Sequence, residues 1–374
     1  MKKILTFVLI ILSIFLSSCV TNIKVSNTIY LEDAFSVSPY ITLISSNKEY
    51  NKYKADIEKD LSSILTSLDE KFDVHNSESY VSQINKNAGI QAVKVDDEVI
   101  KVLNEAILVS MEVTYKYDVT IYPLVKLWGF NGSGEACIPS VDAINEVLPL
   151  IDYKKIKIEG NSVYLEEKGM MIDLGSIVKG YACDLMANKM ALTYPNFDYI
   201  INVGGNIYTY GNTIRNNKKD DIHVGITTPF YTNLKAILND IQYENCYYIG
   251  YIKAKSEGTT VVTSGTYERY ITDDDGNMYH HILDPNTGMP FENNIDSLTV
   301  IMNGENVSMT SDALSTALFS LGINEALNYA NNYGIGIVIV TKDKKIYISN
   351  SIKDVFVYNE VLNSAGYEYI NNTN

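Results

Sequence analysis

The stretch Thr259–Pro290 constrains the fold most, because two turn signals flank a pair of histidines within it. An apolar run ends in Thr-Ser-Gly at 263–265, which predicts a turn that leaves hydroxyls and open N–H groups at a strand end. The acidic run 273–277 is typical of a hairpin turn, since Asp and Gly accept the positive φ that such turns need. A return strand then carries His280 and His281 into a second polar turn. The pattern indicates one wall of an active site, and the alternative is a surface hairpin with a polar tip.

Size and charge narrow the class of protein. The 374 residues suffice for one large domain or two closely packed ones. A hydrophobic content of 46% with 20% charged residues indicates a globular fold. The formal net charge of −15 argues against nucleic-acid binding, since phosphate contacts need clustered Lys and Arg. An anionic substrate would therefore need a local cation, either a metal ion or a well-placed lysine.

The first residues form a targeting segment. Two lysines precede an apolar run, residues 4–16, that is too short for an ordinary spanning helix. The run ends in Leu-Ser-Ser-Cys, which resembles a bacterial lipobox and implies cleavage before Cys19 and lipidation of its thiol. We expect a signal peptide at 1–18, a lipidated N-terminus and linker at 19–40, and a lipid anchor at the extracytoplasmic face of the bacterial cell membrane. The alternatives are a simple secreted signal or a membrane anchor.

Three cysteines follow that cleavage site, namely Cys137, Cys183 and Cys246. They lie far apart and form no CxxC pair, which argues against zinc and thiol-redox motifs. Cys183 lies in an apolar helical stretch and is expected to be a buried small hydrophobe. One disulfide between two of the three is possible, and the sequence does not indicate which two would pair.

Hydrophobic spacing predicts an α+β fold, because strands outnumber βαβ units and hairpins recur. Apolar residues three and four apart predict helices at 51–69, 99–117 and 141–148, a helix that follows a strand and a Gly turn and ends near 192, and one from 308. Strands are expected at 41–47, 199–207, 267–271, 278–283, 297–302, 335–340 and 345–349, with a further hairpin across 153–165.

Six segments resemble motifs of the ApbE family, the flavin transferases, over residues 40–345. YDVTIYPLVKLWGF at 117–130 resembles FDxTxxPLVxLWGF, and IDLGSIVKGYACD at 172–184 resembles IDLGGIAKGYAVD. TSG, YxRY and HIxDPxTGxP recur in this order within the 263–290 stretch. SYVSQIN at 79–85, NVGGNI at 202–207 and SDALSTALFSLG at 311–322 are similar to SExSxxN, NxGGDI and ADALxTALxxLG.

The resemblance implies a compact catalytic domain at 41–350 with a ligand cleft between two sub-regions, and leaves a polar tail at 351–374. It implies FAD contacts from Asn85, Trp128, Gly129, Phe130, Asp173, Lys179 and Ile282, and metal ligation by Ser176, Asp312 and Thr316. Asp312 and Thr316 are four apart and share a helical face, and hard oxygen ligands suit Mg²⁺.

Several residues of these motifs also have a plain structural interpretation. Ser79 could simply cap a short helix, and a lone tryptophan such as Trp128 is usually a core residue. Lys179 could be a solvated helix lysine, and Asp312 could be an acid favoured by the helix dipole.

Five positions depart from the family pattern. Tyr80 replaces a Glu, Val178 replaces the commoner Ala, and Ser176 replaces the commoner Gly but keeps oxygen ligands. Asn206 stands where Asp is common, which puts a charged role there in doubt. Met309 stands where some relatives have a second Asp, so that ligand is missing here.

In this family the reaction is the Mg²⁺-dependent transfer of FMN from FAD to a Thr or Ser hydroxyl of a partner protein, with release of AMP. His281 is the candidate base for the hydroxyl, since histidine changes protonation near neutral pH, and His280 should face the other side of the strand. We expect an acceptor with a flavinylation motif, either a membrane redox-complex subunit or an extracytoplasmic flavoprotein. The alternatives are an Mg²⁺-dependent FAD pyrophosphatase and a flavin-binding lipoprotein without chemistry.

Overall fold

A nine-stranded sheet forms the centre of the computed structural model, which describes residues 24–113, 116–132, 135–216 and 218–370. Neighbouring strands are antiparallel, except for the parallel pair β17–β19. The predicted signal peptide and Cys19 lie outside the described residues. In sheet order the strands are β1 (Lys24–Tyr30), β2 (Tyr40–Ser46), β6 (Asp198–Val203), β7 (Asn206–Tyr210), β12 (Thr259–Gly265), β15 (Ile295–Asn303), β16 (Gly336–Thr341), β17 (Lys345–Ile348) and β19 (Glu368–Tyr369).

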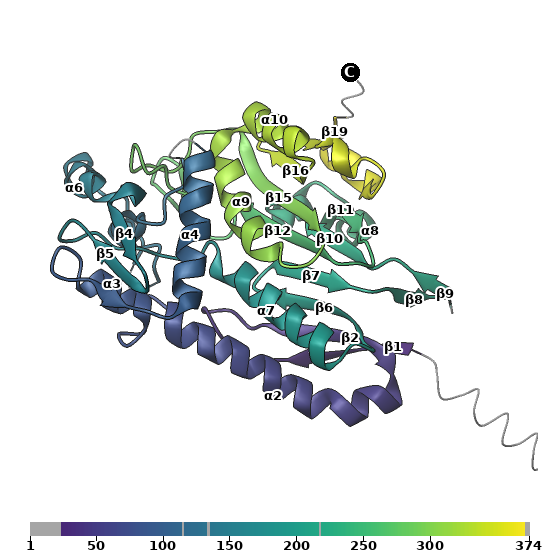
Figure 1. Cartoon of the computed structure of the whole chain (residues 1–374). Helices are drawn as coiled ribbons and strands as arrows, with labels where there is room; N and C mark the ends of the chain where they lie inside the picture. The colour runs from purple at the N-terminus through teal and green to yellow at the C-terminus, as the bar shows by residue number, and fades with distance from the viewer. Residues whose placement is uncertain (1–23, 114–115, 133–134, 217, 371–374) are drawn as a thin grey trace, which may run out of the picture.

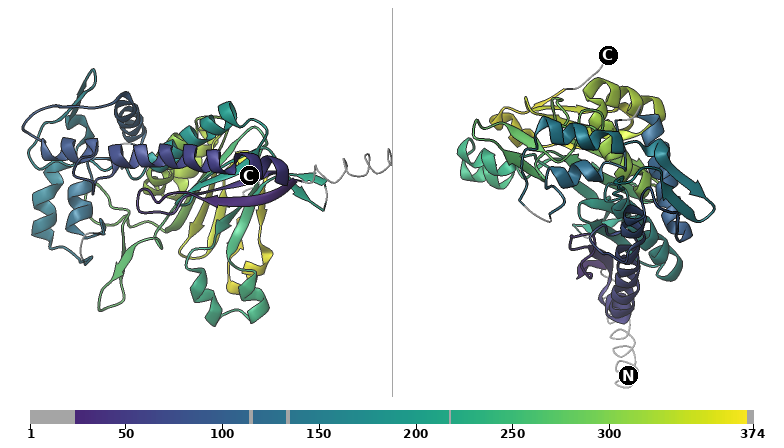
Figure 2. Two further views of the ribbon diagram at one scale, coloured as in Figure 1. Left: turned by 90° about the horizontal axis from the view of Figure 1, so that it is seen from below. Right: turned by 90° about the vertical axis from the view of Figure 1, so that its left-hand side faces the viewer.

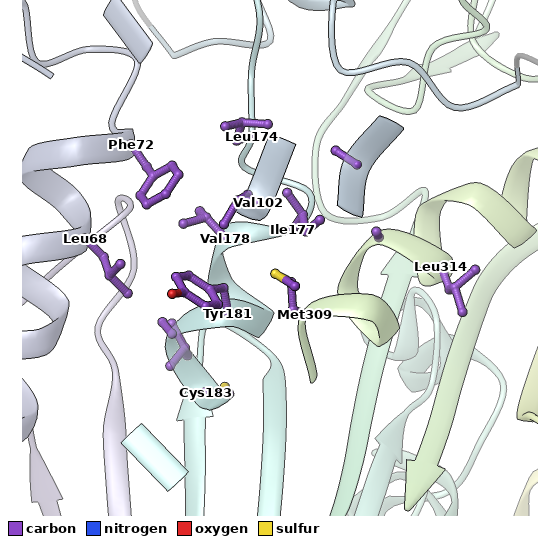
Figure 3. Packing of buried hydrophobic residues seen from close by; sticks show 14 of the residues in the cluster. Leu68, Phe72, Val102, Leu174, Ile177, Val178, Tyr181, Cys183, Met309 and Leu314 are labelled. Carbon is purple, nitrogen blue, oxygen red and sulfur yellow. The ribbon is translucent and has the colours of Figure 1, made fainter. Parts of the chain in front are cut away.

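Helices cover one face of this sheet (Figure 1). They are α2 (Asn47–Phe72), α4 (Asp97–Glu112), α7 (Val178–Thr193), α9 (Ser308–Leu321) and α10 (Ile323–Tyr333). α2 begins where the Ser46 side chain accepts the Glu49 N–H at 3.3 Å, and its buried residues recur at steps of three and four. Figure 3 shows Phe72, Tyr181 and Met309 gathering in the core between α2, α7 and α9. This core fixes α7 against α9.

A small sheet covers the opposite face of the main sheet. It consists of β10 (His223–Thr227), β11 (Tyr248–Lys253) and β18 (Phe356–Tyr358). Val224 and Ile249 from this sheet pack against Val261 and Val338 from the main sheet in a second hydrophobic core. The main sheet is therefore buried on both faces, which explains why its central strands are almost continuously apolar.

The remaining elements extend from this sandwich (Figures 1 and 2). Among the described residues they comprise a three-stranded sheet, two hairpins and four short α-helices. Their bounds are α3 (Tyr80–Lys86), β3 (Val93–Lys94), α5 (Tyr122–Leu127), α6 (Val141–Val147), β4 (Ile156–Glu159), β5 (Ser162–Leu165), β8 (Thr213–Arg215), β9 (Lys218–Asp220), α8 (Asp240–Glu244), β13 (Tyr270–Thr272) and β14 (Met278–His280).

The predicted α+β fold is confirmed, and so are the helices and hairpins that carried the clearest hydrophobic spacing. The predicted turn at 263–265 is wrong, because these residues finish β12 and pair with β15. The strand expected before Gly175 is reduced to a single bridge between Met171 and Ile121. The strand expected at 267–271 begins only at Tyr270.

Both chain ends belong to the fold over a longer range than the sequence indicated. The segment 19–40 was interpreted as a lipidated terminus and linker, yet its residues 24–30 form β1, which pairs with β2 along seven residues. The segment 351–374 was interpreted as a tail, yet it contributes β18 and β19 to two sheets. Short, polar edge strands have weak sequence signals, because one of their faces stays in water.

Two further findings bear on the sequence analysis. No helix in the described part of the chain is long and apolar enough to cross a membrane. Cys137, Cys183 and Cys246 are free cysteines, of which only Cys137 is exposed.

Candidate active site

The loop that leads into α7 is fixed from two sides. The Asn85 side chain forms a two-way amide pair with the backbone of Ile172, with Nδ2–O and Oδ1–N distances of 2.9 and 2.7 Å. Asp173 donates its backbone N–H to Val119 at 2.8 Å, and its Oδ1 accepts the Gly175 N–H at 2.8 Å. The resemblance assigned Asn85 and Asp173 to FAD. In the structure the hydrogen bonds of both residues hold the 172–175 loop in place.

The first turn of α9 is held by a buried carboxylate. Asp184 of α7 accepts the backbone N–H groups of Ser308 and Met309, each at 2.9 Å. These are N–H groups that have no partner within the helix, so Asp184 acts as its cap from a neighbouring helix. The orientation of α9, and of every side chain on it, therefore depends on α7.

Asp312 lies one turn further along α9 and faces the start of α7. Its Oδ2 accepts the Gly180 N–H at 2.9 Å, and the residue is only 4% exposed. Burial raises the pKa of this carboxyl above its usual range, and the nearby Lys179 ammonium partly opposes that effect. Burial of a negative charge costs free energy unless a cation lies beside it. A buried carboxylate such as Asp312 is therefore suited to binding a cation.

Lys179 occupies the position of such a cation. Its Nζ donates to the Gly175 carbonyl oxygen and lies 4.0 Å from Asp312 Oδ2. The ammonium thus bridges the 172–175 loop and α9. Two oxygen groups from two different elements already converge on one positive charge here.

Further hydroxyls lie on the same side of α9. Thr316 Oγ1 is 3.1 Å from Ser264 Oγ at the end of β12, and Ser264 Oγ is 2.7 Å from Ser315 Oγ. Ser176 Oγ is 2.9 Å from the Tyr117 hydroxyl, so its side chain is held by a residue outside the predicted set. The described residues contain no cluster of three or more His, Cys, Asp or Glu side chains with metal-binding geometry. Any cation here must therefore bind mainly to neutral oxygens and one carboxylate.

Asn206 completes the surroundings of Asp312. It is only 3% exposed, and hydrogen bonding from its side chain helps to stabilise the ionised form of Asp312. The Asn206 Oδ1 atom is buried and has no hydrogen-bond partner in the described part of the chain. An unsatisfied buried acceptor is costly and marks a place where a donor or cation would be stabilised.

Gly180 sets the distance between α7 and α9. A Cβ at this position would lie 2.2 Å from the Ser308 carbonyl oxygen and 2.7 Å from Asp312 Cβ. Both neighbours are firmly packed, so neither can move away without displacing α9.

We therefore expect Gly180→Ala to reduce the free energy of unfolding by about 1–3 kcal/mol, the usual cost of overpacking. The variant should also weaken any ligand contact that uses Asp312. Urea unfolding followed by circular dichroism measures the first effect. Unchanged stability would mean that the two helices do not depend on this close approach.

His281 lies directly after β14 and is half-buried. Its Nδ1 is 3.1 Å from the Arg269 carbonyl oxygen, which can only accept a hydrogen bond. Nδ1 therefore carries the proton, and Nε2 of the neutral ring keeps a lone pair. Desolvation lowers the pKa of His281 to about 4, so the neutral ring predominates at pH 7. This is the state that a general base requires.

His280 faces the other way, as the strand alternation predicted. It is 2% exposed, its Nε2 is 3.2 Å from the Phe291 carbonyl oxygen, and its ring contacts Phe319 edge-on. His280 is therefore a core residue, and its replacement by Ala would leave a cavity.

The aromatic residues predicted for the flavin cleft lie in the packed layer behind His281. Trp128 is 0% exposed, its ring stacks on Phe130 with centroids 5.9 Å apart, and its Nε1 donates to the Gly288 carbonyl at 2.9 Å. Phe130 is also buried and meets the His281 ring edge-on at 6.5 Å. Both rings are packed in the core of this structure, and their contact with FAD stays a prediction. Phe130 contacts the His281 ring, and Trp128 packs against Phe130.

Gly129 and Ile282 also have structural roles, one in a turn and the other in the core. Gly129 has φ +72°, and a Cβ there would meet Ala136 at 2.7 Å, so only glycine fits this turn. The Ile282 side chain is buried in the main core, and its carbonyl accepts the Phe291 N–H at 3.1 Å.

Sequence reasoning missed several residues that organise the site. They are Tyr117, Gly180, Asp184, Ser264 and the backbone carbonyl of Arg269. Most lie inside motifs that were recognised, so the signal was present. What the sequence lacked was any indication that α7 and α9 meet at Gly180.

Known proteins resemble this chain over most of its length. The family model for the ApbE family matches residues 33–339. The chain belongs to the ApbE family. An ApbE relative from Klebsiella pneumoniae, the protein "FAD:protein FMN transferase", is 32% identical over 294 residues, which cover 77% of this chain and 83% of that protein. A protein of the same name from Treponema pallidum is 27% identical, covering 80% and 82% of the two chains.

Solved structures show the same fold. The ApbE protein from Thermotoga maritima superposes with a TM-score of 0.74 at 29% identity, covering 88% of this chain and 98% of that one. The flavin transferase ApbE from Vibrio cholerae gives a TM-score of 0.73 at 22% identity, covering 88% and 100%. The α+β architecture is thus that of the ApbE family.

Proposed function

We propose that this protein transfers FMN from FAD to a hydroxyl of an acceptor protein and releases AMP. The observation that carries the proposal is the buried Asp312 carboxylate at the α7–α9 junction, which accepts the Gly180 N–H and lies 4.0 Å from the Lys179 ammonium that donates to the Gly175 carbonyl. The relatives named as FAD:protein FMN transferases cover most of both chains, which supports the same reaction class.

Mg²⁺ fits the oxygen groups of this junction. Asp312, Thr316 and the turn at Gly175–Ser176 would hold it, since they offer one carboxylate, a hydroxyl and carbonyl oxygens. When bound, Mg²⁺ supplies positive charge that offsets charge developing on the pyrophosphate oxygens. The orphaned Asn206 Oδ1 supports a cation or its bound water close by. Lys179 would then be released to pair with a phosphate.

His281 acts on the acceptor in this proposal. The acceptor hydroxyl loses its proton to Nε2 of His281, and its oxygen forms a bond to the phosphorus on the FMN side of FAD. The bond between that phosphorus and the bridging oxygen breaks, and AMP leaves with that oxygen. The Arg269 carbonyl stabilises the imidazolium that results, because Nδ1–H continues to donate to it.

The alternative reaction is hydrolysis, in which water replaces the acceptor hydroxyl. The two reactions share the site, so products decide between them. The protein should be incubated with FAD and Mg²⁺, with and without a peptide that carries a flavinylation motif. Mass spectrometry should find FMN on the peptide and an equal amount of AMP. Free FMN at the same rate in both incubations would support the pyrophosphatase instead.

The proposed location is the extracytoplasmic face of the cell membrane. The motif Leu-Ser-Ser-Cys ending at Cys19 supports lipidation there, and a membrane redox-complex subunit or an extracytoplasmic flavoprotein would then be within reach as the acceptor.

We expect the wild-type N-terminal peptide to begin at an acylated Cys19 and Cys19→Ala to keep an unprocessed N-terminus. Both are read by mass spectrometry of the N-terminal peptide from isolated membranes. Identical unmodified N-termini in the two forms would exclude the lipid anchor.

A further inference from the structure

The β8–β9 hairpin projects beyond the end of the main sheet (Figure 1). Its residues Arg215, Lys218 and Lys219 are exposed, and Ile214 adds an apolar side chain that is 38% exposed. Arg215 Nε pairs with Asp220 Oδ2 at 3.2 Å, whereas Lys218 and Lys219 form no ion pair with any described residue. A cationic, partly apolar tip of this kind is unusual in a chain with a net charge of −15.

The hairpin leaves the sheet at the same end at which the described chain begins. Strand register places Lys24 opposite Ser46, and Ile44 opposite Asp198. The next pair, Tyr199 with Tyr210, puts the end of β7 there too, and β8 starts three residues later. The ammonium of Lys24 contacts the Asp198 carboxylate across this end.

The length of chain before β1 limits how far this end can lie from a membrane. Cys19 precedes Lys24 by five residues, which span at most about 18 Å when fully extended. An acyl chain on Cys19 would therefore bring the β1 end and the β8–β9 hairpin to the bilayer surface.

We propose that the β8–β9 hairpin is a second membrane contact, which docks on anionic phospholipid headgroups beside the lipid anchor; the pairing rests on the proposed lipidation of Cys19. Basic residues close to an anionic membrane surface each add to binding, so a basic hairpin beside the anchor would hold this end of the molecule against the headgroups. Two acidic residues at this end are offset, because Asp198 pairs with Lys24 and Asp220 with Arg215. Asp221, Glu257 and Glu305 are exposed there and form no ion pair with a described residue, so the basic side chains that can reach a membrane are those of the hairpin itself.

This docking gives the active site a defined height. Ser264, which contacts Thr316, lies five residues along β12 from Thr259 at the membrane end. Five strand residues correspond to about 17 Å. The acceptor hydroxyl would thus have to be presented up to about that far above the headgroups, the full distance applying when β12 stands upright on the membrane.

The test uses the chain from residue 20 onward, which keeps every described residue and lacks the lipid. Its binding to vesicles of equimolar phosphatidylglycerol and phosphatidylcholine is measured by cosedimentation at low salt. The triple variant R215Q/K218Q/K219Q should bind at least about tenfold more weakly, because each cation near a charged surface contributes several-fold. High salt or pure phosphatidylcholine vesicles should abolish the difference.

The matched control is K154Q/K157Q/K168Q, which removes three exposed charges around the β4–β5 hairpin at the other end of the molecule (Figure 1). It should bind as the unsubstituted chain does, and both variants should unfold at the same urea concentration. Equal losses in the two variants would show a diffuse charge effect and overturn the proposal, as would the absence of binding to anionic vesicles. An unmodified Cys19 in cells would overturn the pairing with a lipid anchor, and the vesicle result would still report on the hairpin itself.

Discussion

Asp312→Asn is expected to lower the Mg²⁺-dependent rate of FMN transfer by at least about a hundredfold, the usual cost of removing one charge-stabilising group from a catalytic site. The substitution keeps the size of the side chain and can still accept the Gly180 N–H. It removes the charge that faces Lys179, so Mg²⁺ should bind more weakly as well. The rate is measured by AMP release, and metal affinity by calorimetry without FAD.

Asp184→Asn is the matched control, because Asp184 is also a buried carboxylate on the α7–α9 junction but caps the α9 backbone. It should reduce the free energy of unfolding by about 1 kcal/mol, as the loss of a helix cap does. Its Mg²⁺ affinity should stay close to that of the unsubstituted protein. Equal metal affinity for the Asp312 and Asp184 variants would contradict the assignment of Asp312 as a ligand.

His281→Ala should slow transfer by roughly 10²–10⁴-fold, the range for a positioned general base, while FAD binding is retained. The prediction rests on the Nδ1–H to Arg269 carbonyl bond, which leaves Nε2 free to accept a proton. Single-turnover kinetics with bound FAD and an acceptor peptide separates binding from transfer. A normal rate per bound FAD, with weakened binding, would make His281 a binding residue.

His280→Leu serves as the control, because it fills the buried space and removes the imidazole. Transfer should change little.

The pH profile adds a second check on His281. Its pKa is lowered to about 4, so the neutral base persists as the pH falls below 6.5, and the acid limb of the rate should lie near pH 4. A half-maximal rate near pH 6.5 would show a solvated histidine instead.

Much of the fold followed from the sequence because its helices and hairpins have strong local signals. α2 and α4 carry apolar residues at helical steps, and the 273–277 turn has the residues that a hairpin requires. The assignment of His280 and His281 to opposite faces needed only the period of a strand. The resemblance to the ApbE family added the order of the motifs.

The remaining features depend on tertiary contacts that no local pattern encodes. Asn85 was expected at FAD, and it binds the backbone of Ile172, which is 87 positions away in sequence. Trp128 was expected to contact FAD, and in the structure its indole N–H donates to the Gly288 carbonyl. A polar side chain near a ligand motif can serve the ligand or the loop that forms the site, and only the three-dimensional structure distinguishes the two.

The account depends most on a cation at the junction between the Gly175 turn and Asp312, and an anomalous-scattering map of crystals grown with FAD and Mn²⁺ tests it directly. Mn²⁺ takes the same oxygen ligands as Mg²⁺ and can be located by its anomalous signal. The predicted result is a peak at coordinating distance from Asp312 and Thr316, with Lys179 moved away from the Gly175 carbonyl. A map with FAD bound but no peak there, and with Lys179 still bridging Gly175 and Asp312, would contradict it.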